Sequence, residues 1–204
     1  MIHPKHQRIH TAETVRIDSH AATTLQYIRN SMEAATAVAV PGSAGIAMGV
    51  VGLLAALFSS TPALHRHWFG IWLVAAIVAA VLGGSLIMRP SPVRGLTLSG
   101  TPFRKFALCL LPSLFAGTVL TGVLWSHSIL QAIPGTWLLL YGCGLIAASV
   151  PTTRMIGVMG ALFIKLGIVA LLLPESMQIL MLGIGFGGLH VVFGFLIGRD
   201  GDAE

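Results

Sequence analysis

Six stretches of the sequence are long and apolar enough to cross a lipid bilayer. A spanning helix needs about 20 mostly apolar residues, because the hydrocarbon core of a bilayer is about 30 Å thick. The linkers between the stretches are too short to fold as a second domain. We therefore expect an all-α, polytopic membrane protein whose transmembrane domain covers residues 21–199. Its six spans are expected at about 34–58 (interrupted at Pro41-Gly42), 68–88, 106–125, 134–150, 155–173 and 176–198.

The composition agrees with a membrane protein and excludes most soluble classes. Hydrophobic residues make up 55% of the 204 residues and charged residues only 9%, whereas soluble domains carry about 25% charged residues. A globule of this size needs a polar surface that this chain cannot supply. A soluble enzyme, a disordered chain and a disulfide scaffold are therefore excluded. Outer-membrane strands alternate polar and apolar residues, and these stretches do not.

The positive charges are distributed unevenly between the two sides of the expected bundle. Of the 12 Lys and Arg residues, ten lie before span one, between spans two and three, between spans four and five, or after span six. Arg66 lies in an outer loop and Lys165 within span five. Because cytoplasmic loops carry the excess of Lys and Arg, we expect both termini in the cytoplasm and a multi-pass protein of the inner (plasma) membrane. The net charge of +5 then reflects topology and contact with lipid headgroups, and no nucleic acid partner is expected.

Residues 21–37 have the pattern of an amphipathic helix that precedes the first span. We expect this helix to lie at the cytoplasmic surface of the bilayer. A second interpretation makes residues 1–33 a docking surface for a cytoplasmic partner. Residues 1–20 are expected to form a mobile basic tail, and residues 200–204 a short acidic tail. The apolar face of the expected helix consists of Leu25, Ile28, Met32 and Ala35.

Two similar motifs begin the first and fourth spans. Val40-Pro41-Gly42-Ser43 is matched by Ile133-Pro134-Gly135-Thr136. Related halves of three spans each would be inverted in the membrane, and inverted repeats with a helix broken at Pro and Gly are typical of many transporters. The alternative is chance similarity, because apolar helices built from Gly, Ala and Leu resemble one another.

Several motifs along the chain occur together in a recognisable order. They are Tyr27-Ile28-Arg29 with Met32-Glu33, Val40-Pro41-Gly42, residues 137–142, Arg154 with Met159-Gly160, and Gly187-Gly188-Leu189-His190 followed by Phe193-Gly194. With these motifs the chain resembles a group of small six-span bacterial membrane proteins over about residues 25–198. The resemblance implies the six-span topology and no particular activity. The acidic C-terminal end and the far N-terminus depart from the group.

Lys165 and His190 are polar residues that the sequence places deep within the spans. Lys165 lies 11 residues beyond Arg154, which is roughly 16 Å at 1.5 Å per residue. A cation near the middle of a bilayer costs about 2.5–3.5 kcal/mol on insertion scales, so such residues usually face the bundle interior. We expect Lys165 and His190 to face the interior and to share an anion, water or ligand. The alternatives are a lysine that snorkels and a histidine that only bonds across helices.

Glycines recur at intervals of four residues in the first and last spans. The segment Gly183-Ile-Gly185-Phe-Gly-Gly188 satisfies the glycine pattern of dinucleotide-binding loops, but it lies within a span and no strand precedes it. Small residues at this spacing allow close helix contacts in membranes, and they favour a homodimer. The glycines expected at helix contacts are Gly45, Gly49, Gly183, Gly187, Gly194 and Gly198.

No motif supports catalysis, a bound metal or a cofactor. A serine–base pair is missing from the positions that an intramembrane protease requires, and His3, His6 and His10 lack a completing ligand. We expect a small transporter or membrane ligand-binding protein rather than an enzyme. The alternative is a non-transporting anchor or sensor that docks a cytoplasmic partner through residues 1–33. The candidates for ligand or ion binding are Lys165, His190, Glu33, Pro41 and Gly42.

Overall fold

The computed structural model describes residues 23–27, 40–88 and 101–202, and for 101–103 and 200–202 it describes the backbone alone. The chain divides into two compact units, Met1–Ala37 and Val38–Glu204. In the first unit, residues 23–27 are helical and exposed. The expected basic tail at 1–20, Glu33 and the rest of the amphipathic helix lie outside the described residues. Residues 203–204 of the acidic tail and the side chains of residues 200–202 also lie outside the description.

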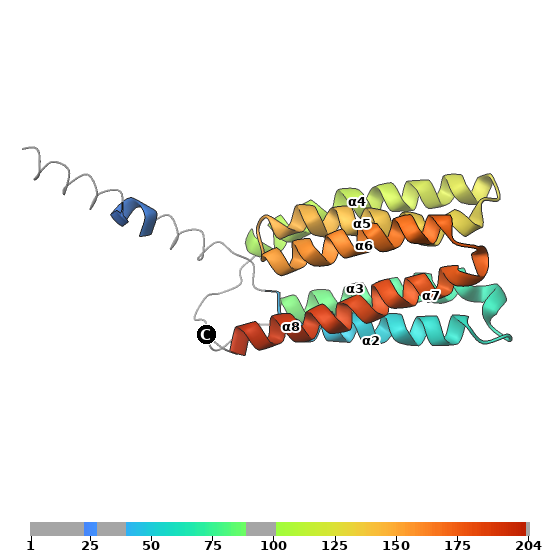
Figure 1. Ribbon diagram of the computed structural model, residues 1–204, viewed down its shortest axis with the longest axis horizontal. Coiled ribbons are helices and arrows are strands. Elements are labelled where there is room, and N and C mark those ends of the chain that lie inside the picture. Colours follow the sequence, from blue (N-terminus) through green and yellow to red (C-terminus); the bar gives the residue numbers. More distant parts are fainter. Residues whose placement is uncertain (1–22, 28–39, 89–100, 203–204) are drawn as a thin grey trace, which may run out of the picture. The chain divides into compact units, whose positions relative to one another are not determined.

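The second unit contains six helical segments that are long and apolar enough to cross a membrane (Figure 1). The described residues contain no strand, so the prediction of an all-helical chain with six long apolar helices is confirmed for them. The sixth segment is a composite of two α-helices and an intervening π-helix. The elements are α2 (Gly42–Ser59), η1 (His65–His67), α3 (Trp68–Ile87), α4 (Thr101–Ser126), η2 (Leu130–Ala132), α5 (Ile133–Ser149), α6 (Arg154–Leu172), η3 (Glu175–Met177), α7 (Gln178–Leu182), η4 (Gly183–Leu189) and α8 (His190–Asp202).

Proline marks two helices of this unit in different ways. Pro41 precedes α2 with extended backbone angles, φ −69° and ψ 135°, and its ring supplies no backbone N–H, which suits a helix start. The described part of the first span therefore begins at Gly42, and the residues expected before it, 34–39, lie outside the description. Pro112 lies inside α4, where α4 continues without interruption. Membrane helices tolerate such prolines when neighbouring groups satisfy the freed carbonyl.

The helices of the second unit pack as two groups of three spans. In one group, α2 contacts both α3 and the sixth span; in the other, α5 contacts both α4 and α6 (Figure 1). The sixth span joins the groups, because α7 also contacts α5 and α6. If span one is exchanged with span four, two with five and three with six, the same set of helix contacts within the two groups results, as an inverted repeat requires. The glycine contacts do not follow the exchange: they join α2 to α8 in one group but α5 to α6 in the other.

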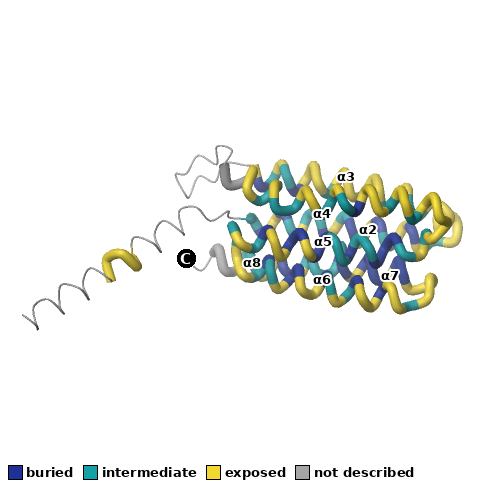
Figure 2. The backbone as a smooth tube through the Cα atoms, turned by 90° about the horizontal axis from the view of Figure 1, so that it is seen from above, coloured by how far each residue is buried: buried dark blue, intermediate teal, exposed yellow. Residues whose placement is uncertain are grey.

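Burial is concentrated where the sixth span meets α5 and α6. The hydrophobic core consists of Leu138, Tyr141, Leu145, Ile156, Met159, Phe163, Ala170, Met181, Leu182 and Phe193. The helices α3 and α4 contribute few buried residues, and Figure 2 shows α3 largely in the colours of exposed and intermediate residues. Large apolar side chains such as Phe115 and Leu172 remain exposed on the outside. Such an outer surface suits lipid rather than water.

Candidate functional site

Glycines bring the backbones of α2 and α8 into direct contact. A Cβ atom added at Gly194 would lie 2.6 Å from the backbone nitrogen of Ile46 and 2.9 Å from the carbonyl carbon of Gly45. A Cβ atom at Gly49 would lie 2.8 Å from the carbonyl oxygen of Gly187. Since real Cβ atoms do not approach backbone atoms so closely, only glycine fits at these positions. The predicted packing glycines Gly45, Gly49, Gly187 and Gly194 lie at this contact.

Of the two remaining predicted glycines, Gly183 is tightly covered and Gly198 has looser surroundings. A Cβ atom at Gly183 would lie 2.8 Å from the Cβ atom of Ala56, and one at Gly198 would lie 4.0 Å from Gly42 Cα. Gly42 itself approaches α8 closely, because a Cβ atom there would meet the carbonyl oxygen of Gly194. The α2–α8 contact therefore runs from the beginning of α2 along most of its length.

The π-helix η4 places the aromatic side chain of Phe186 between the helix groups. Its glycines let it touch both sides, because a Cβ atom at Gly187 would lie 2.7 Å from Leu53 of α2, and one at Gly185 would lie 3.2 Å from Phe163 of α6. Phe186, from η4, lies with its ring centroid 5.3 Å from that of Phe163 and 5.0 Å from that of Tyr141. π-helices are rare and are frequent at functional sites. Here the π-helix supports an aromatic cluster that joins the groups.

A buried hydrogen bond crosses between the groups beside this cluster. The hydroxyl oxygen of Tyr141 on α5 lies 2.8 Å from Nε2 of His190 at the start of α8, and the two side chains are 8% and 4% exposed. Nδ1 of His190 is buried and has no hydrogen-bond partner. The tautomer decides the direction of the bond: with the proton on Nδ1, Tyr141 donates its hydroxyl proton to Nε2, and with the proton on Nε2, His190 donates to the hydroxyl oxygen.

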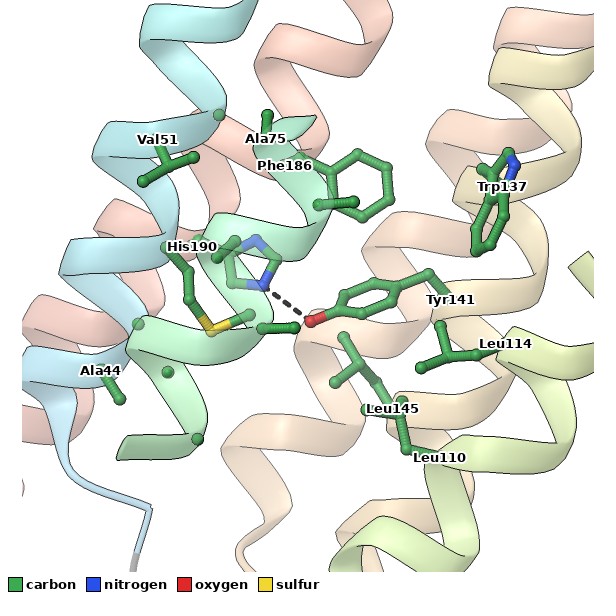
Figure 3. Close-up of a pocket in the computed structure, with 18 of the residues that line it drawn as sticks. Ala44, Val51, Ala75, Leu110, Leu114, Trp137, Tyr141, Leu145, Phe186 and His190 are labelled. Carbon is green, nitrogen blue, oxygen red and sulfur yellow. Dashed lines mark hydrogen bonds between the residues drawn. The ribbon is translucent and has the colours of Figure 1, made fainter. Parts of the chain in front are cut away.

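A cavity of about 630 Å³ lies beside the Tyr141–His190 pair. Figure 3 shows the two side chains directed toward each other, with Leu110 and Leu114 of α4 on one side and Ala44 and Val51 of α2 on the other. Its volume lies within the range of small-molecule sites, about 300–1,000 Å³. The wall extends from Val40, Pro41, Gly42 and Ile87 at one end to Trp68, Phe69, Ile133 and Pro134 at the other.

The cavity exists because α3 presents small side chains toward α4. Between these helices, the described residues show one ring contact, Phe69 with Trp125 at a centroid distance of 5.2 Å, and no extended packing. A Cβ atom added at Gly84 would meet nothing within 4 Å. The small residues of α3 that line the cavity are Ala75, Ala76, Ala79, Ala80, Gly83 and Gly84.

The lining is almost entirely apolar, and its few polar groups are mostly occupied. None of the described residues that line the cavity is Lys, Arg, Asp or Glu. Thr121 accepts a hydrogen bond from Nε1 of Trp137 at 2.9 Å and donates one to the carbonyl oxygen of Gly117 at 2.7 Å. The indole nitrogen of Trp72 has no partner but is buried in the wall. The Tyr141–His190 pair is thus the main polar feature.

The structure does not bring Lys165 and His190 together. His190 is buried and lines the cavity, whereas Lys165 is exposed and does not line it. The reason is rotation about the α6 axis: Phe163, Gly167 and Ala170 form the buried side of this helix, and position 165 lies between them on the opposite side. The expectation that Lys165 faces the interior and shares a site with His190 is therefore wrong. The position of a residue along a span does not determine which side of the helix its side chain faces.

Two other candidates lie at one end of the cavity. Pro41 and Gly42 line it where α2 begins, while Glu33 lies outside the described residues. No group of three or more His, Cys, Asp or Glu residues that could hold a metal ion occurs in the described part of the chain. His65, which lies between α2 and α3, has its Nδ1 atom 3.1 Å from the carbonyl oxygen of Ser59 at the end of α2. The site's chemistry is therefore apolar contact plus hydrogen bonding at one pair.

Sequence reasoning missed Tyr141, Phe186 and the small residues of α3. The signal for α3 is visible in Ala75-Ala76, Ala79-Ala80 and Gly83-Gly84, because small residues four apart form a smooth face on a helix. The pairing of Tyr141 with His190, which are 49 residues apart, has no local signal. No protein-family model, curated protein or solved structure matches the chain. Function is therefore argued from the site.

Proposed function

We propose that the chain is a multi-pass protein of the bacterial inner membrane that binds an apolar ligand in the cavity between its two helix groups. This is the activity of a small transporter or a membrane ligand-binding protein. The observation that carries the proposal is a large apolar cavity with one buried hydrogen-bonded pair, Tyr141 and His190, in its wall. Ligand sites have this composition, an apolar lining with a few placed polar groups.

The size of the cavity supports an occupant. At about 24 cal/mol per Å³, a sealed and empty cavity of 630 Å³ would cost on the order of 15 kcal/mol. That equals or exceeds the entire stability of a typical domain, about 5–15 kcal/mol. Apolar cavities do not hold water, because water needs polar partners. These walls favour apolar matter as the occupant, and a membrane supplies it.

The charges support the proposed orientation. Arg104, Lys105, Arg154 and Arg199 are exposed at the end of the unit where α2 begins, and Arg66 is exposed at the opposite end. The excess of positive residues marks the cytoplasmic side. Reporter domains fused at residue 64, at residue 130 and at the C-terminus test this arrangement: the first two should be active outside the cytoplasm and the third inside. An extracytoplasmic C-terminus would overturn the proposed orientation.

The native tryptophans make ligand binding measurable. Trp68, Trp72 and Trp137 line the cavity, whereas Trp125 does not and is replaced in the Trp125→Phe variant. Bromine atoms quench tryptophan fluorescence on contact, so dibrominated octadecane and dibrominated octadecanol should quench this variant at saturable concentrations. Adding Gly84→Leu to this variant places a side chain in the cavity. The apparent affinity of both probes, measured by quenching, should then fall at least tenfold.

Gly122→Leu is the matched control for cavity filling. Gly122 also has nothing within 4 Å of an added Cβ atom, but it does not line the cavity. This variant should therefore bind both probes like the parent protein. Equal quenching in the Gly84→Leu and Gly122→Leu proteins would show that the probes only partition into the surrounding detergent, and would overturn the proposed binding site.

A second proposal concerns the first unit, in which Leu25 and Tyr27 are 67% and 72% exposed. Exposed apolar side chains on a helix suit either the membrane surface or a cytoplasmic partner. On this proposal the protein is an anchor or sensor, and residues 1–33 dock the partner. Deleting residues 2–20 separates the two proposals, because a ligand-binding bundle should keep its quenching response unchanged. Loss of that response would assign the binding to the first unit instead.

A further inference from the structure

We infer that the ligand is an uncharged long-chain alcohol whose hydroxyl group hydrogen-bonds to the Tyr141–His190 pair. This inference rests on the proposed binding function and specifies its chemistry. Three features of the cavity carry it: the absence of charged residues among the described lining residues, the hydrogen-bonding capacity left on the pair, and the length of the apolar lining.

The lining excludes a charged group at the depth of the pair. A carboxylate, phosphate or ammonium buried among apolar side chains needs a counter-charge or several hydrogen bonds, because desolvation of an ion is costly. No described lining residue is Lys, Arg, Asp or Glu. Lys165, which lies within α6, is exposed and lies outside the lining. A fatty acid anion or a phospholipid headgroup therefore does not match this part of the cavity.

The pair retains hydrogen-bonding capacity beyond its internal bond, at the hydroxyl group of Tyr141 and at Nδ1 of His190, which has no partner. A phenolic hydroxyl can donate one hydrogen bond and accept others. With Tyr141 donating to Nε2 of His190, its oxygen still accepts, so the ligand must donate. If the tautomer reverses and His190 donates, the hydroxyl of Tyr141 becomes the free donor. An alcohol satisfies the pair in both states, whereas an alkane satisfies it in neither.

The position of the pair within the lining indicates a chain as the rest of the ligand. Tyr141 lies near the middle of α5, whose lining residues run from Ile133 to Leu145. Apolar side chains and small residues of α3 continue along the cavity on both sides of this depth, from Trp68 to Ile87. A ligand that fills such a cavity while offering one hydroxyl group is a long alkyl or isoprenoid alcohol.

The experiment compares three probes on the Trp125→Phe protein in detergent micelles: dibrominated octadecane, octadecanol and octadecanoate. One additional hydrogen bond is worth about 1 kcal/mol net, or about fivefold in affinity. We expect the alcohol to bind about fivefold more tightly than the alkane and the carboxylate to bind most weakly. Tyr141→Phe combined with His190→Phe leaves no hydrogen-bonding atom of the pair, so it should remove the preference for the alcohol over the alkane, while binding of the alkane is retained.

The chain offers a matched control for the loss of a tyrosine hydroxyl. It contains two tyrosines, and Tyr27 lies in the first unit, so Tyr27→Phe should keep the preference for the alcohol. Equal affinities of alcohol and alkane in the parent protein would overturn the inference, yet leave the proposed function intact if Gly84→Leu still weakens both. Tightest binding of the carboxylate would also overturn it. Failure of every probe to distinguish Gly84→Leu from Gly122→Leu would overturn the proposed function itself.

Discussion

The glycines of the sixth span and the small residues of α3 both recur at intervals of four residues, but their surroundings differ. Gly187 of η4 and Gly194 of α8 are covered by the backbone and side chains of α2, with no room for a Cβ atom. Gly84 of α3 faces open space, and its neighbours Ala76 and Ala80 line the cavity. Small residues therefore close one face of the bundle and open another. The difference lies in whether a second helix carries a complementary glycine face.

The largest expected effect comes from a side chain at the closed face. Gly194→Val would place methyl groups against the backbone of α2 at Gly45 and Ile46. Overpacking of this kind costs about 1–3 kcal/mol, and more when backbones must separate, so we expect a loss of about 3 kcal/mol. Equilibrium unfolding in mixed micelles measures the change. A loss below about 0.5 kcal/mol would show that the α2–α8 contact is looser than described.

An intermediate effect is expected at the Tyr141–His190 pair, which joins the two helix groups. Tyr141→Phe leaves Nε2 of His190 buried without its hydrogen-bond partner, and an unsatisfied buried group costs about 1–3 kcal/mol. We expect a loss of about 1 kcal/mol in the same unfolding measurement. His190→Phe combined with Tyr141→Phe should lose less than the sum of the single variants, because no unpaired nitrogen remains. Additive losses would contradict a direct interaction between the two side chains.

Little effect is expected at the open face. Gly84→Val adds the same methyl groups as Gly194→Val, but into open space. The free energy of unfolding should change by no more than about 0.5 kcal/mol, the usual range for substitutions that disturb no packing. Thermal unfolding of the two variants side by side gives the comparison directly. Equal destabilisation by both would show that α3 and α4 close on each other in solution.

The smallest effect is expected at Lys165. Its side chain is exposed on α6, so it contacts lipid or detergent in the folded bundle and also when the helices separate. Lys165→Leu should therefore leave the free energy of unfolding within about 0.3 kcal/mol of the parent value, although it favours membrane insertion by about 3 kcal/mol. Quenching by dibrominated octadecanol should also be unchanged. A large destabilisation would indicate that Lys165 has a partner in the folded bundle.

The sequence predicts the helices of this protein far better than its site. Long apolar stretches define α3 to α6 to within five residues, and the end of α2 to within one, because crossing a bilayer demands helices of that length and composition. The direction of a side chain depends on rotation about the helix axis, which weak amphipathicity leaves undetermined. The sequence therefore predicts the position of Lys165 along α6 but not the side of the helix on which it lies. The π-helix that positions Phe186 and His190 adds a further rotation that a regular helical wheel does not contain.

The glycine contact between α2 and α8 also constrains the order in which the bundle is assembled. Helices α5 and α6 follow one another along the chain and pack through Gly142 and Gly160, so this hairpin can form as soon as both have left the ribosome. The partner of α2 at its glycine face is α8, which follows it only after four other spans. Because long-range contacts must wait for both segments, the small-residue face of α2 stays uncovered until α8 has been synthesised. Completion of the first helix group, and of the cavity wall it provides, is therefore later than formation of the α5–α6 hairpin.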